Sequence, residues 1–118
     1  PPVKTLFVPV EPVKGYSSCE VYGFKGTILV DQADLLAGLQ VVVWDDEVGL
    51  TALDALDAKG AYFIEIETKP AERNLWVQVY QNDVPVSEPL LLKPQIDCQN
   101  GFQIFQVDWR ALSMENGE

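Results

Sequence analysis

In the stretch Tyr62-Phe63-Ile64-Glu65-Ile66-Glu67, large apolar side chains recur at every second position and two glutamates fall between them. Successive side chains of a β-strand point to opposite faces, so Tyr62, Ile64 and Ile66 are expected to face a core while the glutamates face water. A strand with one dry and one wet face is typical of an antiparallel sheet.

The next apolar stretch, Leu75-Trp76-Val77-Gln78-Val79-Tyr80, follows the same rule. It turns Leu75, Val77 and Val79 inward and leaves Trp76 and Tyr80 on the outer face. Large amphipathic rings on an outer face suit stacking on sugar rings or contact with another protein. We therefore take Trp76 and Tyr80 as a candidate ligand face.

Two further tryptophans, Trp44 and Trp109, either extend that platform or belong to the core. We expect them to form a core pair.

Turn signals divide the rest of the chain into short runs rich in Val, Ile, Leu and aromatic residues. The expected strands cover residues 19–30, 39–44, 50–56, 61–68, 74–81, 88–92 and 101–109. Residues 31–37, ended by Gly38, are expected to form a loop with one helical turn. The pattern predicts an all-β fold: a single antiparallel β-sandwich of seven to eight strands over residues 15–110, followed by a polar tail over residues 111–118.

Residues 1–14 are expected to form an extended N-terminal arm, interrupted by Pro9 and Pro12 and joined to the sandwich by a hinge at residues 15–18. Its apolar side chains, which cannot be buried by the arm alone, are those of Val3, Leu6, Phe7, Val8 and Val10. The arm is the domain's own edge strand, a strand donated to a neighbouring copy, or a linker. The continuous apolar run Leu90-Leu91-Leu92 is the expected acceptor edge for a donated strand.

The two cysteines, Cys19 and Cys98, lie 79 positions apart and belong to no CxxC or metal-binding cluster. They form either a structural disulfide or two buried free thiols, and we expect the disulfide. A disulfide places the chain outside the cytoplasm.

Composition narrows the function classes. The 118 residues carry a formal net charge of −10 and no histidine. Clustered cations for nucleic acid or an anionic membrane are lacking, and so is the commonest general base. No apolar run approaches the roughly 20 residues of a membrane-spanning helix. We therefore expect no enzyme activity, no cofactor, no nucleic acid and no membrane insertion.

Acidic residues gather in the loops, where carboxylates can bind calcium or simply remain solvated. The candidate calcium ligands are Asp45, Asp46, Glu47, Asp54 and Asp57, with Asp31 and Asp34 in a neighbouring loop. No EF-hand spacing is present, and we expect solvated carboxylates rather than a metal site.

Three segments resemble a known pattern: Gly26-Thr27-Ile28-Leu29-Val30, Leu36-Ala37-Gly38-Leu39-Gln40-Val41-Val42-Val43 and Asp57-Ala58-Lys59-Gly60-Ala61-Tyr62. In this order they resemble a first strand, a turn that opens the second strand, and a hairpin turn of the carboxypeptidase-regulatory-like, transthyretin-like sandwich domains of secreted and surface proteins. The resemblance implies an Ig-like, transthyretin-like β-sandwich. The resemblance covers residues 24–80. It implies a module that spaces, stiffens or binds and does not catalyse. The family does not supply the arm, and residues 50–56 replace its usual threonine-rich strand.

Together these observations predict a non-enzymatic, extracellular subunit that assembles with copies of itself into a surface filament by donating its N-terminal strand. The alternative is a spacer or a carbohydrate- or protein-binding module of a larger surface protein. The chain opens on Pro1-Pro2 without an initiator methionine, so we expect a processed product or part of a longer chain.

Overall fold

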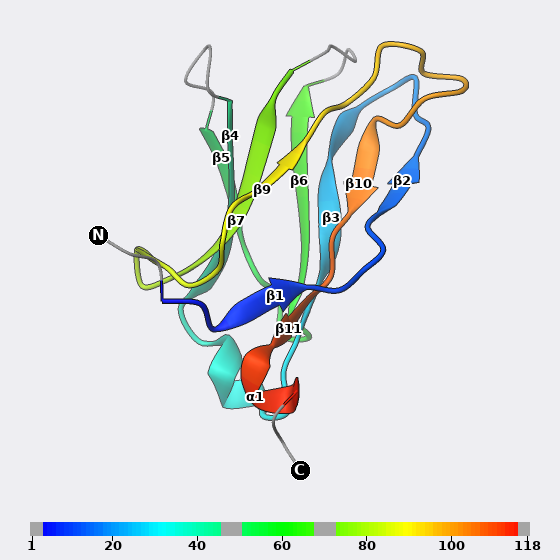
Figure 1. Cartoon of the computed structure of the whole chain (residues 1–118). Helices are drawn as coiled ribbons and strands as arrows, with labels where there is room; N and C mark the ends of the chain where they lie inside the picture. The colour runs from blue at the N-terminus through cyan, green and yellow to red at the C-terminus, as the bar shows by residue number, and fades with distance from the viewer. Residues whose placement is uncertain (1–3, 46–50, 68–72, 116–118) are drawn as a thin grey trace.

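The structure, a computed structural model, describes residues 4–45, 51–67 and 73–115. This part of the chain is all-β, with eleven strands in two sheets and two four-residue helices (Figure 1). The strands are β1 (Phe7–Pro9), β2 (Lys14–Tyr16), β3 (Tyr22–Leu29), β4 (Leu39–Asp45), β5 (Thr51–Ala55), β6 (Ala61–Glu67), β7 (Leu75–Gln81), β8 (Val84–Pro85), β9 (Leu90–Leu92), β10 (Ile104–Gln106) and β11 (Trp109–Ala111). The helices are η1 (Ala33–Leu36), a 3₁₀ turn, and α1 (Leu112–Glu115).

The first sheet has the order β1-β11-β3-β10-β2, and β6 pairs with the other edge of β3. β10 and β11 follow each other along one edge of β3 and run parallel to it, with Phe105 opposite Phe24 and Trp109 opposite Ile28. The expectation of a wholly antiparallel fold is therefore wrong. Alternation along a strand reveals which face is buried, but it carries no information about the direction of the neighbouring strand.

The second sheet has the order β5-β4-β7-β8. β9 also pairs with β7, along the first part of that strand, whereas β8 pairs with its last two residues. β7 and β8 are joined by a two-residue turn in which Asn82 and Asp83 have φ angles of 50° and 68°. Two consecutive residues of positive φ are characteristic of the hairpin turn whose twist matches the flanking strands.

The strand count exceeds the expected seven to eight because two segments are each divided into two strands, and because β8 forms where no strand was expected. The predicted run over residues 101–109 is divided between β10 and β11 at Val107 and Asp108. There, the Asp108 carboxylate accepts the Thr27 backbone N–H at 2.9 Å, so a side chain replaces a backbone partner in the ladder. The terminal segment is likewise divided into β1 and β2.

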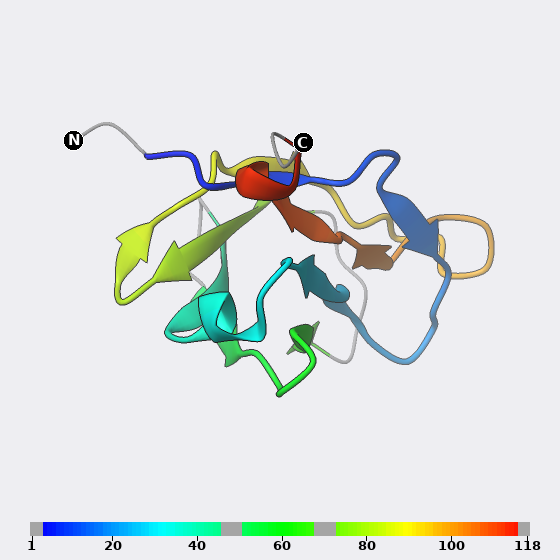
Figure 2. The ribbon, with the colours of Figure 1, turned by 90° about the horizontal axis from the view of Figure 1, so that it is seen from below.

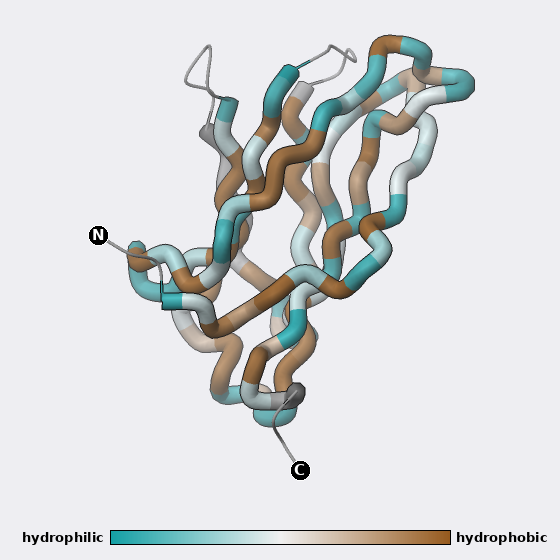
Figure 3. Tube along the Cα trace, viewed as in Figure 1, coloured by the Kyte–Doolittle hydropathy of each residue, from teal (hydrophilic) through white to brown (hydrophobic). Residues whose placement is uncertain are grey.

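The two sheets share one hydrophobic core (Figure 3). Both predicted alternations are confirmed: Tyr62 and Ile64 are buried with Ile66 packed beside them, and Leu75, Val77 and Val79 are wholly buried. Other buried members are Phe7, Tyr22, Phe24, Ile28, Leu39, Val41, Val43, Val86, Phe105, Val107, Trp109 and Ala111.

Three boundary expectations require correction. Gly15, expected in a hinge, lies within β2, where a side chain would collide with the Phe102 ring. Ala111, expected in a polar tail, is a buried residue of β11, and α1 follows it directly. The turn at residues 57–60 forms as expected, with Gly60 at φ +83°, but it links β5 and β6 of different sheets and is not a hairpin turn.

The helical turn expected within residues 31–37 is confirmed as η1, and Gly38 follows with φ +77°. Neither helix in the described part of the chain is long and apolar enough to cross a membrane. Seen from below, η1 and α1 lie together at one end of the molecule (Figure 2).

Candidate functional site

The N-terminal strand β1 is an edge strand of the first sheet, and it also contacts Val86, the residue that follows β8 of the second sheet. On one side it pairs antiparallel with β11, with Phe7 opposite Ala111. On the other side the backbone N–H groups of Leu6 and Phe7 donate to the carbonyl oxygen of Val86 at 2.8 and 3.1 Å. The Leu112 N–H donates to the Leu6 carbonyl at 2.9 Å. β1 therefore bridges the end of the second sheet to the first sheet and closes this side of the molecule.

The side chains of the arm divide between core and surface. Phe7 is 4% exposed and belongs to the hydrophobic core, whereas Leu6 is 36% exposed. Val8 and Val10 are half-buried, and Val3 lies outside the described residues. Within this chain the arm thus takes the position of the domain's own edge strand, one of the three arrangements that the sequence left open.

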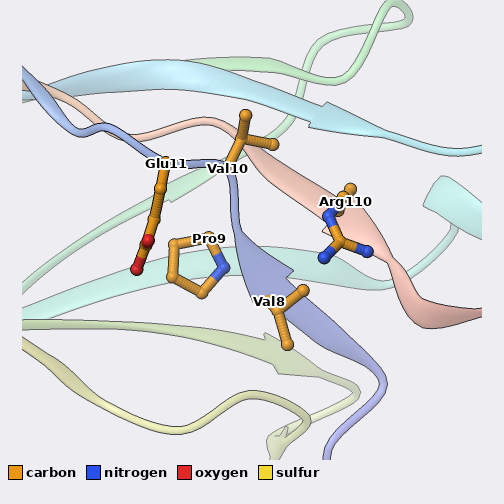
Figure 4. A pocket seen from close by; sticks show the side chains of 5 residues that line it. All are labelled: Val8, Pro9, Val10, Glu11 and Arg110. Carbon is orange, nitrogen blue, oxygen red and sulfur yellow. The ribbon is translucent and has the colours of Figure 1, made fainter. Parts of the chain in front are cut away.

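The segment that joins β1 to β2, residues 10–13, lies outside the strands. Beside it is an open hollow of about 530 Å³ lined by Val8, Pro9, Val10, Glu11 and Arg110 (Figure 4). Val8 and Arg110 are directly paired across β1 and β11. At the start of this segment the Val10 N–H donates to the Asp108 carbonyl at 2.7 Å.

The predicted acceptor edge corresponds to β9. Leu90, Leu91 and Leu92 pair with β7 on one side, and no described strand pairs with β9 on the other. Leu91 is 38% exposed and its two neighbours are half-buried. Pro89 and Pro94 flank the strand, and short edge strands bounded by proline are a known protection against unintended pairing. β9 is thus an open edge of restricted length.

The outer face of the second sheet carries a row of three large side chains. Trp44, Trp76 and Leu91 are directly opposite one another on β4, β7 and β9. The two indole rings are stacked, with centroids 6.3 Å apart and planes 15° from parallel. The expectation that Trp44 is a core residue is therefore wrong, because in β4 Val41, Val43 and Asp45 take the inward positions. Trp109 is wholly buried, as expected.

Tyr80 lies on the same face as Trp76 but not beside it. It pairs with Gln40 and Pro85, four residues along β7 from Trp76, which corresponds to about 13 Å of strand. The structure therefore brings Trp76 together with Trp44, whereas the sequence had grouped it with Tyr80.

The calcium candidates do not converge in the described part of the chain. Asp45 ends β4, is 3% exposed and lies 4.0 Å from the Arg73 guanidinium. Asp57 lies in the turn after β5, near the opposite end of β4. Asp46, Glu47 and the side chain of Asp54 are outside the described residues. In the described ranges, no three acidic, cysteine or histidine side chains gather to hold a metal ion.

Asp57 has a local role that the structure makes clear. Its carboxylate accepts the backbone N–H groups of Lys59 and Ala61 at 2.8 and 2.9 Å. These hydrogen bonds stabilise the charged carboxylate and hold the pKa of Asp57 below its usual value. The bond from Ala61 has the largest effect on this pKa and the bond from Lys59 the next largest. This carboxylate is therefore used to form a turn.

Cys19 and Cys98 form the expected disulfide, with Cα atoms 4.8 Å apart. The bond braces the loop before β10, which sequence reasoning had not singled out. Gln103, wholly buried, holds the same loop: its Nε2 donates to the carbonyls of Gln95 and Asp97, both at 2.9 Å, and its Oε1 accepts the Ser18 N–H at 2.7 Å. Cys98 was the only sequence signal that this loop is ordered.

Comparisons with protein-family models, with curated proteins and with solved structures found no match to this chain. The resemblance to transthyretin-like domains stays a prediction from the three segments that carry it.

Proposed function

We propose that this chain is a non-enzymatic structural subunit that acts outside the cytoplasm and assembles with copies of itself by exchanging β1. The observation that carries the proposal is the position of β1, a terminal strand bonded on both sides between β11 and Val86. Phe7 inserts into the core from this strand. The groove of β1, meaning the space between β11 and Val86 that this strand fills, offers an identical strand of a second copy the same bonds and the same core position for Phe7.

Exchange costs little because the exchanged arm repeats the contacts of the closed monomer. The balance between the two forms is then set by chain concentration and by the conformation of residues 10–13, which lie between the strands. Head-to-tail exchange produces a filament when the rotation between successive copies does not close a ring. The two-sheet core supports the sandwich arrangement that the resemblance implies.

The disulfide supports the proposed setting outside the cytoplasm. Disulfides persist in oxidising compartments, and the Cys19–Cys98 bond supports a location outside the cytoplasm. The edge of β9 is a second acceptor for an extended segment, but it is only three residues long. We favour the groove of β1 as the acceptor because it offers hydrogen bonds on both sides and a buried site for Phe7.

The test exploits the direct pairing of Val8 with Arg110. Chains with Val8→Cys, carrying a mass tag, are refolded together with untagged Arg110→Cys chains and oxidised. A mixed disulfide forms only where an arm from one chain lies on β11 of another. Mixed dimers on a non-reducing gel are expected. Their absence at concentrations where the protein self-associates would contradict strand exchange.

A matched control uses Leu29, which pairs with Arg110 on the far side of β11. Leu29 is 42% exposed but lies two strands from β1, about 10 Å from Val8, which is beyond the reach of a disulfide. Mixtures of Val8→Cys and Leu29→Cys chains are therefore expected to give only the background of random collisions.

The second candidate function is a carbohydrate-binding module, favoured by the stacked pair of Trp44 and Trp76 on an outer face. Both rings are half-buried, so each retains exposed aromatic surface. Binding on a glycan array that is lost in Trp76→Ala and in Trp44→Ala, but kept in Tyr80→Ala, supports this function. An array without binding to the native chain argues against it.

A further inference from the structure

The loop of residues 93–103 presents large apolar side chains to solvent at one end of the molecule. Ile96 is 61% exposed and Phe102 is 46% exposed. The chain measures 43 × 28 × 22 Å, and this loop, orange in Figure 1, lies at the end opposite to η1 and α1. Because most of its surface is exposed, the Ile96 side chain adds little to the hydrophobic stabilisation of the fold.

This loop is unusually well braced for an exposed segment. Besides the disulfide at Cys98 and the three bonds of buried Gln103, Asp97 holds the loop from within. Its carboxylate accepts the backbone N–H groups of Gln99 and Asn100, both at 3.1 Å, and its carbonyl accepts the Gly101 N–H at 2.7 Å. The loop therefore holds Ile96 in a fixed position, and a pre-formed contact residue loses little entropy on binding.

The opposite end carries a complementary feature. A largely apolar hollow of about 180 Å³ lies where β1 begins, between η1 and α1. Leu35, Leu6 and Leu112 line it, and the first two are 38% and 36% exposed. An apolar cavity of about 150 Å³ accommodates a benzene ring, so this hollow is large enough for one isoleucine side chain.

We propose that Ile96 of one copy docks into this hollow of the next copy, head to tail along the long axis. An apolar projection and an apolar hollow at opposite ends of one chain make a heterologous contact, which builds an open filament when the rotation between successive copies does not close a ring. The arm itself builds the hollow, since Leu6 and Phe7 line it. The inference thus rests on the proposed self-assembly and names a second contact between the same copies.

The test compares the self-association of variants of the 118-residue chain by sedimentation velocity over a range of concentrations. Ile96→Asp and Leu35→Asp each place a carboxylate in the contact and are expected to weaken association about 10- to 100-fold. The control is Phe63→Asp. Phe63 is 53% exposed on the outer face of β6, so this substitution adds the same charge away from the proposed contact. It is expected to associate like the native chain.

A rescue variant separates docking from simple surface polarity. Ile96→Asp combined with Leu35→Lys pairs opposite charges across the contact, and we expect it to recover part of the lost association. Ile96→Asp chains that associate like the native protein, or an equal loss in Phe63→Asp, would overturn the docking.

The arm experiment with Val8→Cys and Arg110→Cys chains is independent of Ile96. Mixed dimers together with an unaffected Ile96→Asp variant would overturn the docking and leave strand exchange standing. Loss of association in Ile96→Asp without mixed dimers would support the docking and remove strand exchange. A native chain that stays monomeric at every concentration and forms no mixed dimers overturns both.

Discussion

Trp109 donates from its indole Nε1 to the hydroxyl oxygen of Tyr62 at 3.4 Å, and the Tyr62 hydroxyl donates in turn to the carbonyl of Val107. Tyr62 comes from β6, and the other two residues come from the end of the chain. The relay therefore ties the last strand to the opposite edge of the first sheet inside the core.

Tyr62→Phe removes the centre of this relay. The Val107 carbonyl and the Trp109 N–H are then left without that partner in a buried site, which costs about 1 to 3 kcal/mol of unfolding free energy. Urea denaturation measures the loss. Tyr16→Phe is the control, because its hydroxyl bond to Gln106 is exposed, and we expect a change within about 0.5 kcal/mol. Equal losses in both variants would mean that the buried relay contributes no more to the free energy of unfolding than an exposed hydrogen bond does.

The same hydroxyl makes stability depend on alkaline pH. Burial raises the pKa of Tyr62 well above its ordinary value of 10.0. The folded state therefore keeps the proton that the unfolded state releases, so the stabilisation is complete below about pH 10 and declines as the pH rises further. Unfolding free energies of the native chain and Tyr62→Phe, measured across this range, should converge as the pH rises. A constant difference would contradict the assignment.

Gln103→Leu is expected to loosen the loop that carries Ile96 while leaving the sheets folded. The change keeps the volume but leaves the Ser18 N–H and the carbonyls of Gln95 and Asp97 without their side-chain partner. Hydrogen exchange of the amides in residues 95–101 should quicken, with strand amides of β4 and β7 unchanged. Gln99→Leu, at an exposed position of the same loop, is the control and should leave exchange as it is.

Removal of the disulfide should cost more than any of these changes. In the chain-entropy description, a bond that closes a 79-residue separation stabilises by about 4 kcal/mol. The double variant Cys19→Ser, Cys98→Ser should lower the free energy of unfolding measured in urea by about this amount, and the urea midpoint should fall with it. A reducing agent should have the same effect on the native chain. A native chain whose midpoint does not move after confirmed reduction would show that the bond carries little stability.

Salt should strengthen self-association. Copies that each carry a formal net charge of −10 repel one another, and the screening length falls from about 10 Å at 0.1 M salt to about 3 Å at 1 M. The contacts proposed for β1 and Ile96 are apolar or between backbone groups, so screening removes the repulsion without weakening them. Sedimentation at low and high salt measures the direction. Dissociation at high salt would indicate that ion pairs hold the copies together.

The sequence by itself determined which apolar residues of β6 and β7 are buried. Alternation in β6 and β7 is a local property of the chain, because each strand places every second side chain on the same face. The disulfide was foreseen from the cysteine count and the lack of any metal-binding cluster. The turn at residues 57–60 was readable because Asp57 and Gly60 meet its backbone requirements locally.

Only the tertiary structure decided which strands are neighbours and what they bring together. The parallel pairing of β10 and β11 with β3, the stacking of Trp44 on Trp76 and the placement of β1 beside Val86 all join residues distant in sequence. Trp44 was misplaced because apolar character alone does not give the phase of a continuous apolar strand. The hollow beside Leu35 and the fixed position of Ile96 depend on several segments at once. Local sequence patterns do not predict which distant segments come into contact.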